Sequence, residues 1–223
     1  MEFTESEVEI VSVHLPKTAG TSFRRILINT YGEEKVFKDY KKQNVSEILS
    51  EIKGQNIRAI HGHFKVDKYE GYFPDAKRII WLREPIKRLI SNYWHQVTHF
   101  QNRKLNLDEI ELEKEKFLIY AKKPNFRNLM SRHFRTKNID NFWFVGVTEF
   151  FEEDAAEIQG LLGWPELTIS KINKHKYPKV YSAFVSSVLS DSEMIDRLTS
   201  LNLKDIKLYD NALKIRQQRR KID

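Results

Sequence analysis

Cysteine is absent from this sequence, and its absence excludes several kinds of chemistry. The chain forms no disulfide bond, has no thiolate nucleophile and offers no cysteine ligand to zinc. Long apolar runs are also absent, because no stretch approaches the roughly 18 residues of a membrane-spanning helix. The first residues, MEFTESEVEI, are acidic and therefore unlike a signal peptide. We expect a cytoplasmic protein without an integral membrane segment.

Internal repeats, low-complexity tracts and Gly/Ser-rich linkers are absent as well. The 223 residues suffice for one α/β domain with a sizeable core, and a second full domain is not expected at this length. We therefore predict a single domain over residues 1–223. Because the acidic residues form no convincing metal-binding cluster, we also expect no metal ion.

Positive charge, by contrast, is in excess. The chain has 38 Lys and Arg residues against 31 Asp and Glu residues, which gives a net charge of +7. This balance favours anionic ligands such as nucleotides, sulfated or acidic sugars, nucleic acids or acidic membrane surfaces. Charge alone does not choose among them.

The most informative segment is residues 16–22, PKTAGTS, which lies between an alternating apolar segment and an amphipathic helix pattern. The N–H groups at the start of that helix, the Thr21 and Ser22 hydroxyls and the Lys17 ammonium can converge on a phosphate or sulfate group. Lys17 precedes Gly20, whereas the lysine of a Walker A motif follows the second glycine. The segment predicts an anion-binding loop of another kind.

Strand and helix patterns alternate along the rest of the chain. They predict strands at residues 57–61, 77–82 and 142–147, and helices at 45–52, 85–100, 108–121, from 125, 149–162 and 192–217. This alternation predicts an α/β fold with a mainly parallel central sheet flanked by helices. The aromatic residues at 81, 93 and 94 are assigned to the core, and the basic residues at 216–221 are interpreted as an exposed helix end.

Polar residues occur at the ends of the predicted strands. Ligands of a parallel sheet bind at the carboxyl ends of its strands, where loops open. Besides residues 16–22, these ends contain His61-Gly62-His63 and Arg83-Glu84-Pro85. Ser91 lies two turns into the helix that follows Arg83, so this pair can hold a second anionic group away from the first loop.

Together these segments resemble sulfotransferases that use 3′-phosphoadenosine 5′-phosphosulfate (PAPS). Residues 16–22 look like the 5′-phosphosulfate loop of that family, and LREPIKRLIS at 82–91 resembles its 3′-phosphate element. The His-Gly-His segment is similar to that of the carbohydrate branch, which includes the heparan sulfate uronosyl 2-O-sulfotransferases. Weaker similarities follow in order at 128–132, 145–149, Asn173 and 205–210. Glu84 and Ser131 depart from the residues that are common in the family.

The resemblance implies a P-loop-like sulfotransferase fold, PAPS as donor co-substrate and adenosine 3′,5′-bisphosphate (PAP) as product. It assigns Lys17 to the oxygen that the migrating SO₃ leaves and Arg132 to the nucleotide. The residues that it assigns to the donor are Lys17, Thr18, Ala19, Gly20, Thr21, Ser22, Arg83, Ser91 and Arg132. The acceptor is then a hydroxyl group, and the branch favours a saccharide.

A general base must remove the proton of the acceptor hydroxyl, and an imidazole titrates in the right range. His63 is the first candidate for this base. His61 is the alternative, or a partner that orients the site. Both positions also fit a strand-end histidine that is hydrogen-bonded to the backbone.

Two other functions fit parts of the pattern. A divergent P-loop kinase or NTPase shares the strand, loop and helix, but its third strand usually ends in a metal-binding aspartate where this chain has Arg83-Glu84. A basic module that binds RNA or another polyanion fits the charge, but the sequence has no nucleic-acid-binding motif. We therefore expect no nucleic-acid partner. Segments 65–71 and 99–106 contain basic and aromatic residues but no readable code for the acceptor.

Overall fold

The computed structural model describes residues 8–135, 137–165 and 175–221. Five parallel strands form one sheet in the order β2-β3-β1-β4-β5. The strands are β1 (Ile10–Val13), β2 (Val36–Asp39), β3 (Ala59–Gly62), β4 (Lys77–Leu82) and β5 (Phe144–Val147). In the register, Val11 of β1 pairs with Ile60 of β3 on one side and with Arg78 of β4 on the other. β1 is therefore the central strand.

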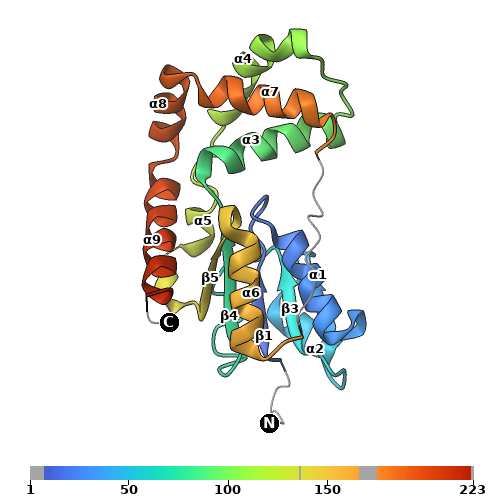
Figure 1. Ribbon diagram of the computed structural model, residues 1–223. Coiled ribbons are helices and arrows are strands. Elements are labelled where there is room, and N and C mark those ends of the chain that lie inside the picture. The colour runs from blue at the N-terminus through green and yellow to red at the C-terminus, as the bar shows by residue number, and fades with distance from the viewer. Residues whose placement is uncertain (1–7, 136, 166–174, 222–223) are drawn as a thin grey trace.

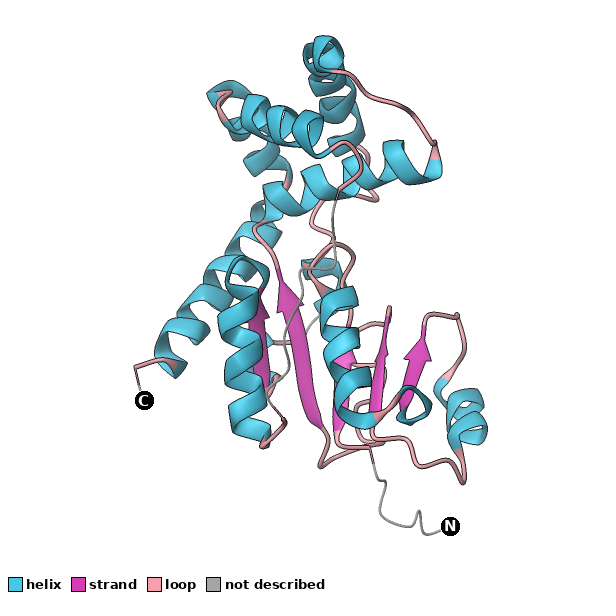
Figure 2. Ribbon diagram, turned by 45° about the vertical axis from the view of Figure 1, so that its right-hand side comes forward, coloured by secondary structure: helices cyan, strands magenta, loops and turns pink. Residues whose placement is uncertain are grey.

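Helices surround this sheet on both faces and above its carboxyl edge (Figures 1 and 2). They are α1 (Gly20–Tyr31), α2 (Val45–Ile52), α3 (Pro85–His95), the π-helical turn η2 (Gln96–Phe100), α4 (Ile110–Ala121), α5 (Ser131–Phe134), α6 (Phe151–Leu162), α7 (Pro178–Leu189), α8 (Ser192–Leu201) and α9 (Leu203–Arg219). Short 3₁₀ turns are η1 (Glu33–Lys35), η3 (Leu107–Glu109), η4 (Ile139–Asn141) and η5 (Thr148–Phe150). The predicted fold class, an α/β fold with a parallel sheet flanked by helices, is confirmed.

The two faces of the sheet are covered by different helices because successive residues of a strand point to opposite faces. Ile79 and Trp81 of β4 share a core with residues of α1 and α6, such as Phe23 and Ile158. Ile80 and Leu82 of the same strand belong to the other core, together with residues of α2, α5 and α9. Both faces are thus buried, which explains the nearly continuous apolar sequence of β4.

A second group of helices stands above the carboxyl ends of the strands. α3, α4, α7 and α8 enclose their own core, which includes Leu89, Trp94, Phe117 and Phe184. In Figure 2 the strand arrows point toward these helices. Trp81, Tyr93 and Trp94 are at most 4% exposed, so their assignment to the core is confirmed.

Two elements were not predicted, namely β2 and α7. β2 is a four-residue edge strand in which the Lys38 side chain is exposed, so its apolar signal is short. α7 contains several serine and β-branched residues, which have low helix propensity, and it is helical because Phe184 and Val188 are buried against α3 and α4. Tertiary packing decides the conformation of both segments.

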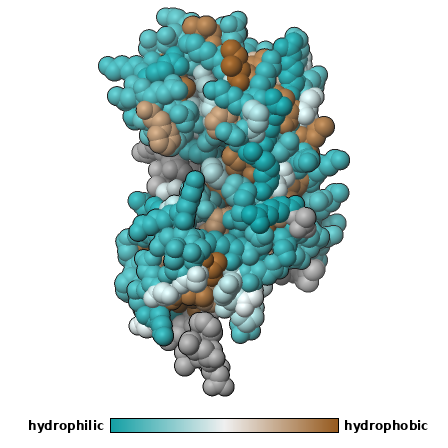
Figure 3. Space-filling model, turned by 180° about the vertical axis from the view of Figure 1, so that it is seen from behind, coloured by the Kyte–Doolittle hydropathy of each residue, from teal (hydrophilic) through white to brown (hydrophobic). Residues whose placement is uncertain are grey.

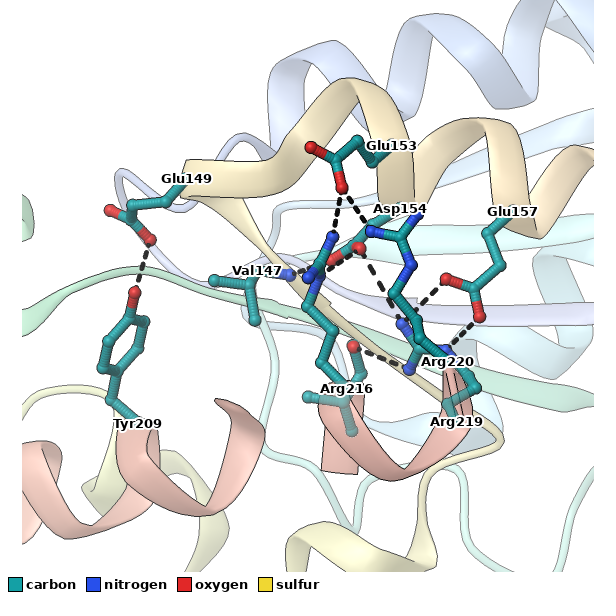
Figure 4. A network of polar contacts seen from close by, with 10 residues as sticks. Val147, Glu149, Glu153, Asp154, Glu157, Tyr209, Arg216, Arg219 and Arg220 are labelled. Carbon is teal, nitrogen blue, oxygen red and sulfur yellow. Dashed lines mark hydrogen bonds and ion pairs between the residues drawn. The ribbon is translucent and has the colours of Figure 1, made fainter. Parts of the chain in front are cut away.

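The interpretation of the C-terminal basic residues as an exposed helix end is wrong for Arg216 and Arg219. Arg216 Nε donates to Asp154 Oδ1 at 2.6 Å, and its guanidinium lies 3.9 Å from the centre of the Phe150 ring. Arg219 pairs with Glu157 of α6 (Figure 4). These contacts fix α9 against α6 and the end of β5, because Asp154 also accepts a hydrogen bond from Val147 N.

The outer surface seen in Figure 3 is mostly hydrophilic, with apolar side chains in scattered patches. Within the described residues, no helix combines the length and the apolarity that crossing a bilayer requires.

Candidate active site

The strand order places a crevice between β1 and β4. From β1 the chain runs to the β2 side of the sheet, whereas from β4 it runs to the β5 side. Ligands of open α/β sheets bind where neighbouring strands diverge in this way. A cavity of about 830 Å³ opens there. It is lined by His14, Pro16, Lys17, Ala19, Gly20, Thr21, Ser22, His63, Arg83, Ser91, Asn92, His95, His99, Phe100, Thr148, Glu149, Phe150, Phe151, Glu152, Glu153 and His175.

The loop between β1 and α1 presents its backbone to this cavity. Lys17 and Ala19 have φ values of 68° and 65°, in the left-handed region that residues other than glycine rarely adopt. Ala19 is the N-cap of α1 and supplies no side-chain hydrogen bond to the helix. The first N–H groups of a helix have no intrahelical partner, so this terminus is suited to an anion. Strained loop residues of this kind cluster at functional sites.

His14 explains why residue 20 is a glycine. A Cβ atom at Gly20 would lie 1.9 Å from Cδ2 of the His14 ring. The His14 ring therefore packs directly on the backbone at the start of α1. It also contacts Tyr40, whose hydroxyl is 3.0 Å from His14 Nδ1. Sequence reasoning missed His14, although it is a polar residue directly after a buried strand.

Among the hydroxyl residues of the loop, Thr21 and Ser22 line the cavity and Thr18 does not. Thr18 is fully buried, and its Oγ1 donates to the carbonyl oxygen of Leu15 at 2.9 Å. Any contact of Thr18 with a ligand is therefore left to its backbone.

Lys17 and Arg83 bring two positive charges together at the ends of β1 and β4. Arg83 Nη1 donates to the carbonyl oxygen of Lys17 at 3.3 Å. Burial, and next the charge of Arg83, lower the pKa of the Lys17 ammonium to about 8. Two partly desolvated cations in one cavity repel each other, and anionic groups bound at each of them remove that cost.

The Arg83 guanidinium forms an ion pair with the Glu149 carboxylate, which lines the same cavity. Glu149 Oε1 lies 4.0 Å from Arg83 Nε and accepts a hydrogen bond from Glu84 N at 3.2 Å. Tyr209 of α9 donates to the other Glu149 oxygen at 3.0 Å (Figure 4). Glu84 itself caps α3, because its carboxylate accepts from Ile86 N and Lys87 N.

Ser91 faces the same cavity from α3. Its side chain is 1% exposed, and its Oγ has no hydrogen-bond partner among the described residues. A buried hydroxyl without a partner is costly unless a ligand supplies one. Arg88, one turn earlier, is fully buried, does not line the cavity and donates to the carbonyl oxygen of Phe126.

His63 lies at the end of β3 and lines the cavity. Its Nδ1 is 2.5 Å from the carbonyl oxygen of His14. A carbonyl oxygen only accepts hydrogen bonds, so Nδ1 carries the proton and Nε2 keeps its lone pair. Burial lowers the pKa of His63, which keeps the ring neutral at neutral pH. This combination suits a group that accepts a proton.

His61 is placed differently. It is fully buried, is not among the residues that line the cavity, and its Nδ1 is 2.9 Å from Ser12 Oγ. Burial holds its pKa well below the usual value. Gly62 between the two histidines allows the close approach of β2, since a Cβ atom there would lie 1.8 Å from the carbonyl oxygen of Asp39.

Arg132 is exposed and does not line the cavity. Its guanidinium donates to the carbonyl oxygen of Asn125, and its assignment to the nucleotide stays a prediction. Asn173 lies outside the described residues.

The sequence-based reasoning also missed three histidines of the cavity wall. His95 and His99 stack on each other at the junction of α3 and η2, with ring centres 4.5 Å apart. His175 stacks on Tyr181 of α7 at 3.7 Å. The four-residue spacing of the first pair was a usable signal, whereas nothing in the sequence connects His175 with this site.

Comparison with known proteins assigns the chain to a family. The model of the sulfotransferase family matches residues 3–211, so the chain belongs to that family. No curated protein sequence matches it at a significant level. Among solved structures, a sulfotransferase from Alicyclobacillus acidocaldarius is similar at 15% identity, covers 91% of this chain and 98% of its own, and gives a TM-score of 0.45. Mouse sulfotransferase SULT7A1, solved in complex with PAP, is similar at 15% identity. The match covers 92% of this chain and 75% of that chain, with a TM-score of 0.40.

The hydrogen bond between His63 and His14 generates a spectroscopic prediction. At pH 7 we expect His63 to be neutral with its proton on Nδ1, because the carbonyl oxygen of His14 requires a donor. Its titration midpoint should lie below the ordinary 6.5, since burial disfavours the charged ring. Long-range ¹⁵N–¹H correlation spectra over a pH series measure both quantities, with the His63→Gln variant to assign the signal. A proton on Nε2, or a midpoint above 6.5, contradicts the geometry.

Proposed function

We propose that this sulfotransferase moves a sulfuryl group from PAPS to an acceptor hydroxyl. The observation that carries the proposal is one cavity with two separate groups for anions. Lys17 and the uncapped start of α1 form the first, and Arg83 with Ser91 forms the second. PAPS has two anionic ends of this kind, the 5′-phosphosulfate and the 3′-phosphate. The unpartnered Ser91 hydroxyl and the two adjacent cations fit such a donor.

Lys17 is proposed to act on the leaving group. When SO₃ departs, negative charge develops on the oxygen that bridges to the 5′-phosphate. An ammonium held at that oxygen, together with the N–H groups at the start of α1, stabilises this charge more than the charge of the ground state. Thr21 and Ser22, which line the cavity beside Lys17, are proposed to hold the phosphosulfate oxygens.

His63 is proposed as the general base, with its Nε2 taking the proton of the acceptor hydroxyl. The acceptor oxygen attacks sulfur in line with the departing phosphate oxygen, so the base and Lys17 act from opposite sides of the SO₃ group. His61 is the weaker candidate because it is buried outside the cavity lining and engaged with Ser12. We place it behind the site, where its ring centre is 5.0 Å from that of His14.

The finer assignments are supported by the sequence alone. A saccharide acceptor, and kinship with the heparan sulfate 2-O-sulfotransferase branch, rest on the His61-Gly62-His63 segment. The cytoplasmic location and the absence of a nucleic-acid partner stay predictions from the sequence. A kinase or NTPase activity is disfavoured because the third strand of such an enzyme usually ends in a metal-binding aspartate, whereas here the Glu84 carboxylate is engaged in capping α3.

Donor binding distinguishes these functions. We expect PAP to bind more tightly than ADP, and ATP with Mg²⁺ to bind no better than ADP. Arg83→Ala should weaken PAP at least about tenfold and leave ADP nearly unchanged, because a charge-assisted contact to the distal phosphate is lost. Isothermal titration calorimetry at fixed ionic strength measures the three affinities. Arg197→Ala, which removes the same charge from an exposed position, is the control. Tighter binding of ATP with Mg²⁺ than of PAP contradicts the proposal and supports the kinase alternative.

The pKa of Lys17 generates a pH prediction for the same measurement. Only the protonated amine attracts the 5′-phosphate, and in the free protein it titrates at about 8. A bound anion favours the charged form, so PAP affinity should fall above pH 8, by up to about tenfold per pH unit. Lys17→Met should bind PAP more weakly and with no such decline. A wild-type affinity that stays constant from pH 7 to pH 9.5 contradicts the placement of Lys17.

Turnover distinguishes the two histidines. With ³⁵S-labelled PAPS and a panel of neutral and acidic oligosaccharides, His63→Gln should lower kcat by about 100-fold or more, the usual contribution of a general base. His61→Gln should lower the melting temperature and retain most of kcat, because His61 contacts Ser12 and does not line the cavity. Unchanged PAP affinity in His63→Gln shows that the donor site is intact. If neither variant loses more than a few-fold in kcat, the base lies elsewhere.

A further inference from the structure

The π-helical turn η2 at the end of α3 contributes to the cavity, and the proposed reaction uses none of its residues. His99 and Phe100 of η2 line the cavity together with His95 of α3. Gln101 N donates to the carbonyl oxygen of Gln96, five residues earlier, at 3.1 Å, which is the π-helical pattern. Short π-helical segments of this kind occur frequently at functional sites.

Hydrogen bonds within η2 fix the protonation of His99. The Thr98 hydroxyl donates to the carbonyl oxygen of Trp94 at 2.7 Å, because a carbonyl oxygen only accepts. The same hydroxyl oxygen lies 3.0 Å from His99 Nδ1. Since its single proton is already used, the hydroxyl accepts and Nδ1 is the donor. In the neutral ring His99 Nε2 then keeps its lone pair, and it has no hydrogen-bond partner in the part of the chain that the structure describes.

His63 and His99 share this arrangement. The Nδ1 proton of His63 is held by the His14 carbonyl oxygen, and that of His99 by the Thr98 hydroxyl. Burial, which is only partial for both rings, lowers their pKa values and keeps them neutral at pH 7. Each ring therefore offers a lone pair at Nε2, and both rings line the same cavity. A ligand with two or more hydroxyl groups matches such a pair of acceptors.

Phe100 adds an apolar surface to these imidazoles. Its side chain is 72% exposed although it lines the cavity. His95 contacts the Phe100 ring edge-on at 5.2 Å and stacks on His99 at an interplanar angle of 20°. Burial, and next the charge of Lys17, lower the pKa of His95 to about 4, so this ring is neutral as well. His95, His99 and Phe100 thus form an uncharged aromatic wall, a surface on which the apolar C–H face of a sugar ring can pack.

The charges of the cavity distinguish an uncharged acceptor from an anionic one. Complete or partial burial lowers the pKa of every histidine that lines the cavity. At neutral pH the cations among its described lining residues are therefore Lys17 and Arg83, and the proposed donor uses both. Lys176 does not line the cavity, and its Nζ donates to the Thr98 carbonyl oxygen at 3.1 Å. An acceptor with carboxylate or sulfate groups would face the negative charges of the donor without a further cation in this lining.

We propose that the aromatic wall binds the acceptor and selects an uncharged saccharide. Phe100 packs on the face of a sugar ring, and His99 Nε2 accepts a hydrogen bond from a hydroxyl group other than the one that His63 deprotonates. His95 is a positioning residue, because it stacks on His99. The inference rests on the proposed function, since the acceptor must bind beside a bound donor. It excludes sulfated and uronic-acid chains as the preferred acceptors.

A matched pair of oligosaccharides tests the class of acceptor. The acidic member is a heparosan hexasaccharide, in which glucuronate alternates with N-acetylglucosamine, and the neutral member is its carboxyl-reduced form. With saturating ³⁵S-labelled PAPS, we expect kcat/KM for the neutral chain to exceed that for the acidic chain at least about tenfold, because like charges in one site repel. Equal values, a preference for the acidic chain, or no transfer to the neutral chain overturns the inference.

Two substitutions in η2 test the residues, with the carboxyl-reduced chain as acceptor. Phe100→Ala should raise KM about tenfold or more, because the burial of an apolar ring is lost. His99→Phe keeps a ring on His95 but removes the lone pair, so KM should rise about threefold to tenfold. Phe100→Trp keeps an aromatic face and should stay near the wild type. Leu112→Ala, which shortens an exposed apolar side chain of α4 outside the cavity, is the control.

The outcomes separate this inference from the proposed function. PAP affinity and kcat of both variants should stay near the wild-type values, and both side chains are exposed, so the melting temperature should not change. If KM for the neutral chain is unchanged in both variants, the inference is overturned while sulfuryl transfer by the wild type supports the proposed function. A matching loss of PAP affinity also overturns it, since it indicates a role in folding or donor binding. If the wild type does not bind PAP, both proposals are overturned.

Discussion

The close approach of Lys17 and Arg83 is the constraint on which the rest of the site depends. The parallel register of β1 and β4 brings their carboxyl ends together, and the Arg83 side chain then reaches the carbonyl oxygen of Lys17. Both cations are partly removed from water, and the pKa of Lys17 falls accordingly. An arrangement of this kind costs free energy in the empty protein and is stabilised by an anion. We therefore infer that this edge of the sheet favours an anionic ligand.

The same strand ends connect the anion site to the histidines. Gly20 admits the His14 ring at the start of α1, and the His14 carbonyl oxygen orients His63. On the opposite wall, Glu149 links Arg83 to Tyr209 of α9. Through Tyr209, α9 thus helps to position residues that line the cavity, although α9 itself does not line it (Figure 4).

Most of the architecture was predictable, because buried parallel strands such as β4 have a strong local pattern. The loop at 16–22 and the polar strand ends were predictable for the same reason, since they interrupt apolar runs. β2 and α7 were not predictable, because their conformations depend on packing against distant segments. The burial of each side chain was also unpredictable, because no local signal distinguishes buried His61 from His63, which lines the cavity.

The central claim is that the Lys17 ammonium faces the 5′ end of the donor while Arg83 and Ser91 face its distal phosphate. A crystal structure of the protein with PAP tests this claim most directly. The account predicts a 5′-phosphate oxygen within hydrogen-bond distance of Lys17 Nζ, and the 3′-phosphate against Arg83 and Ser91. A nucleotide bound in the reverse direction, or a Lys17 amine that points to bulk solvent, would contradict it.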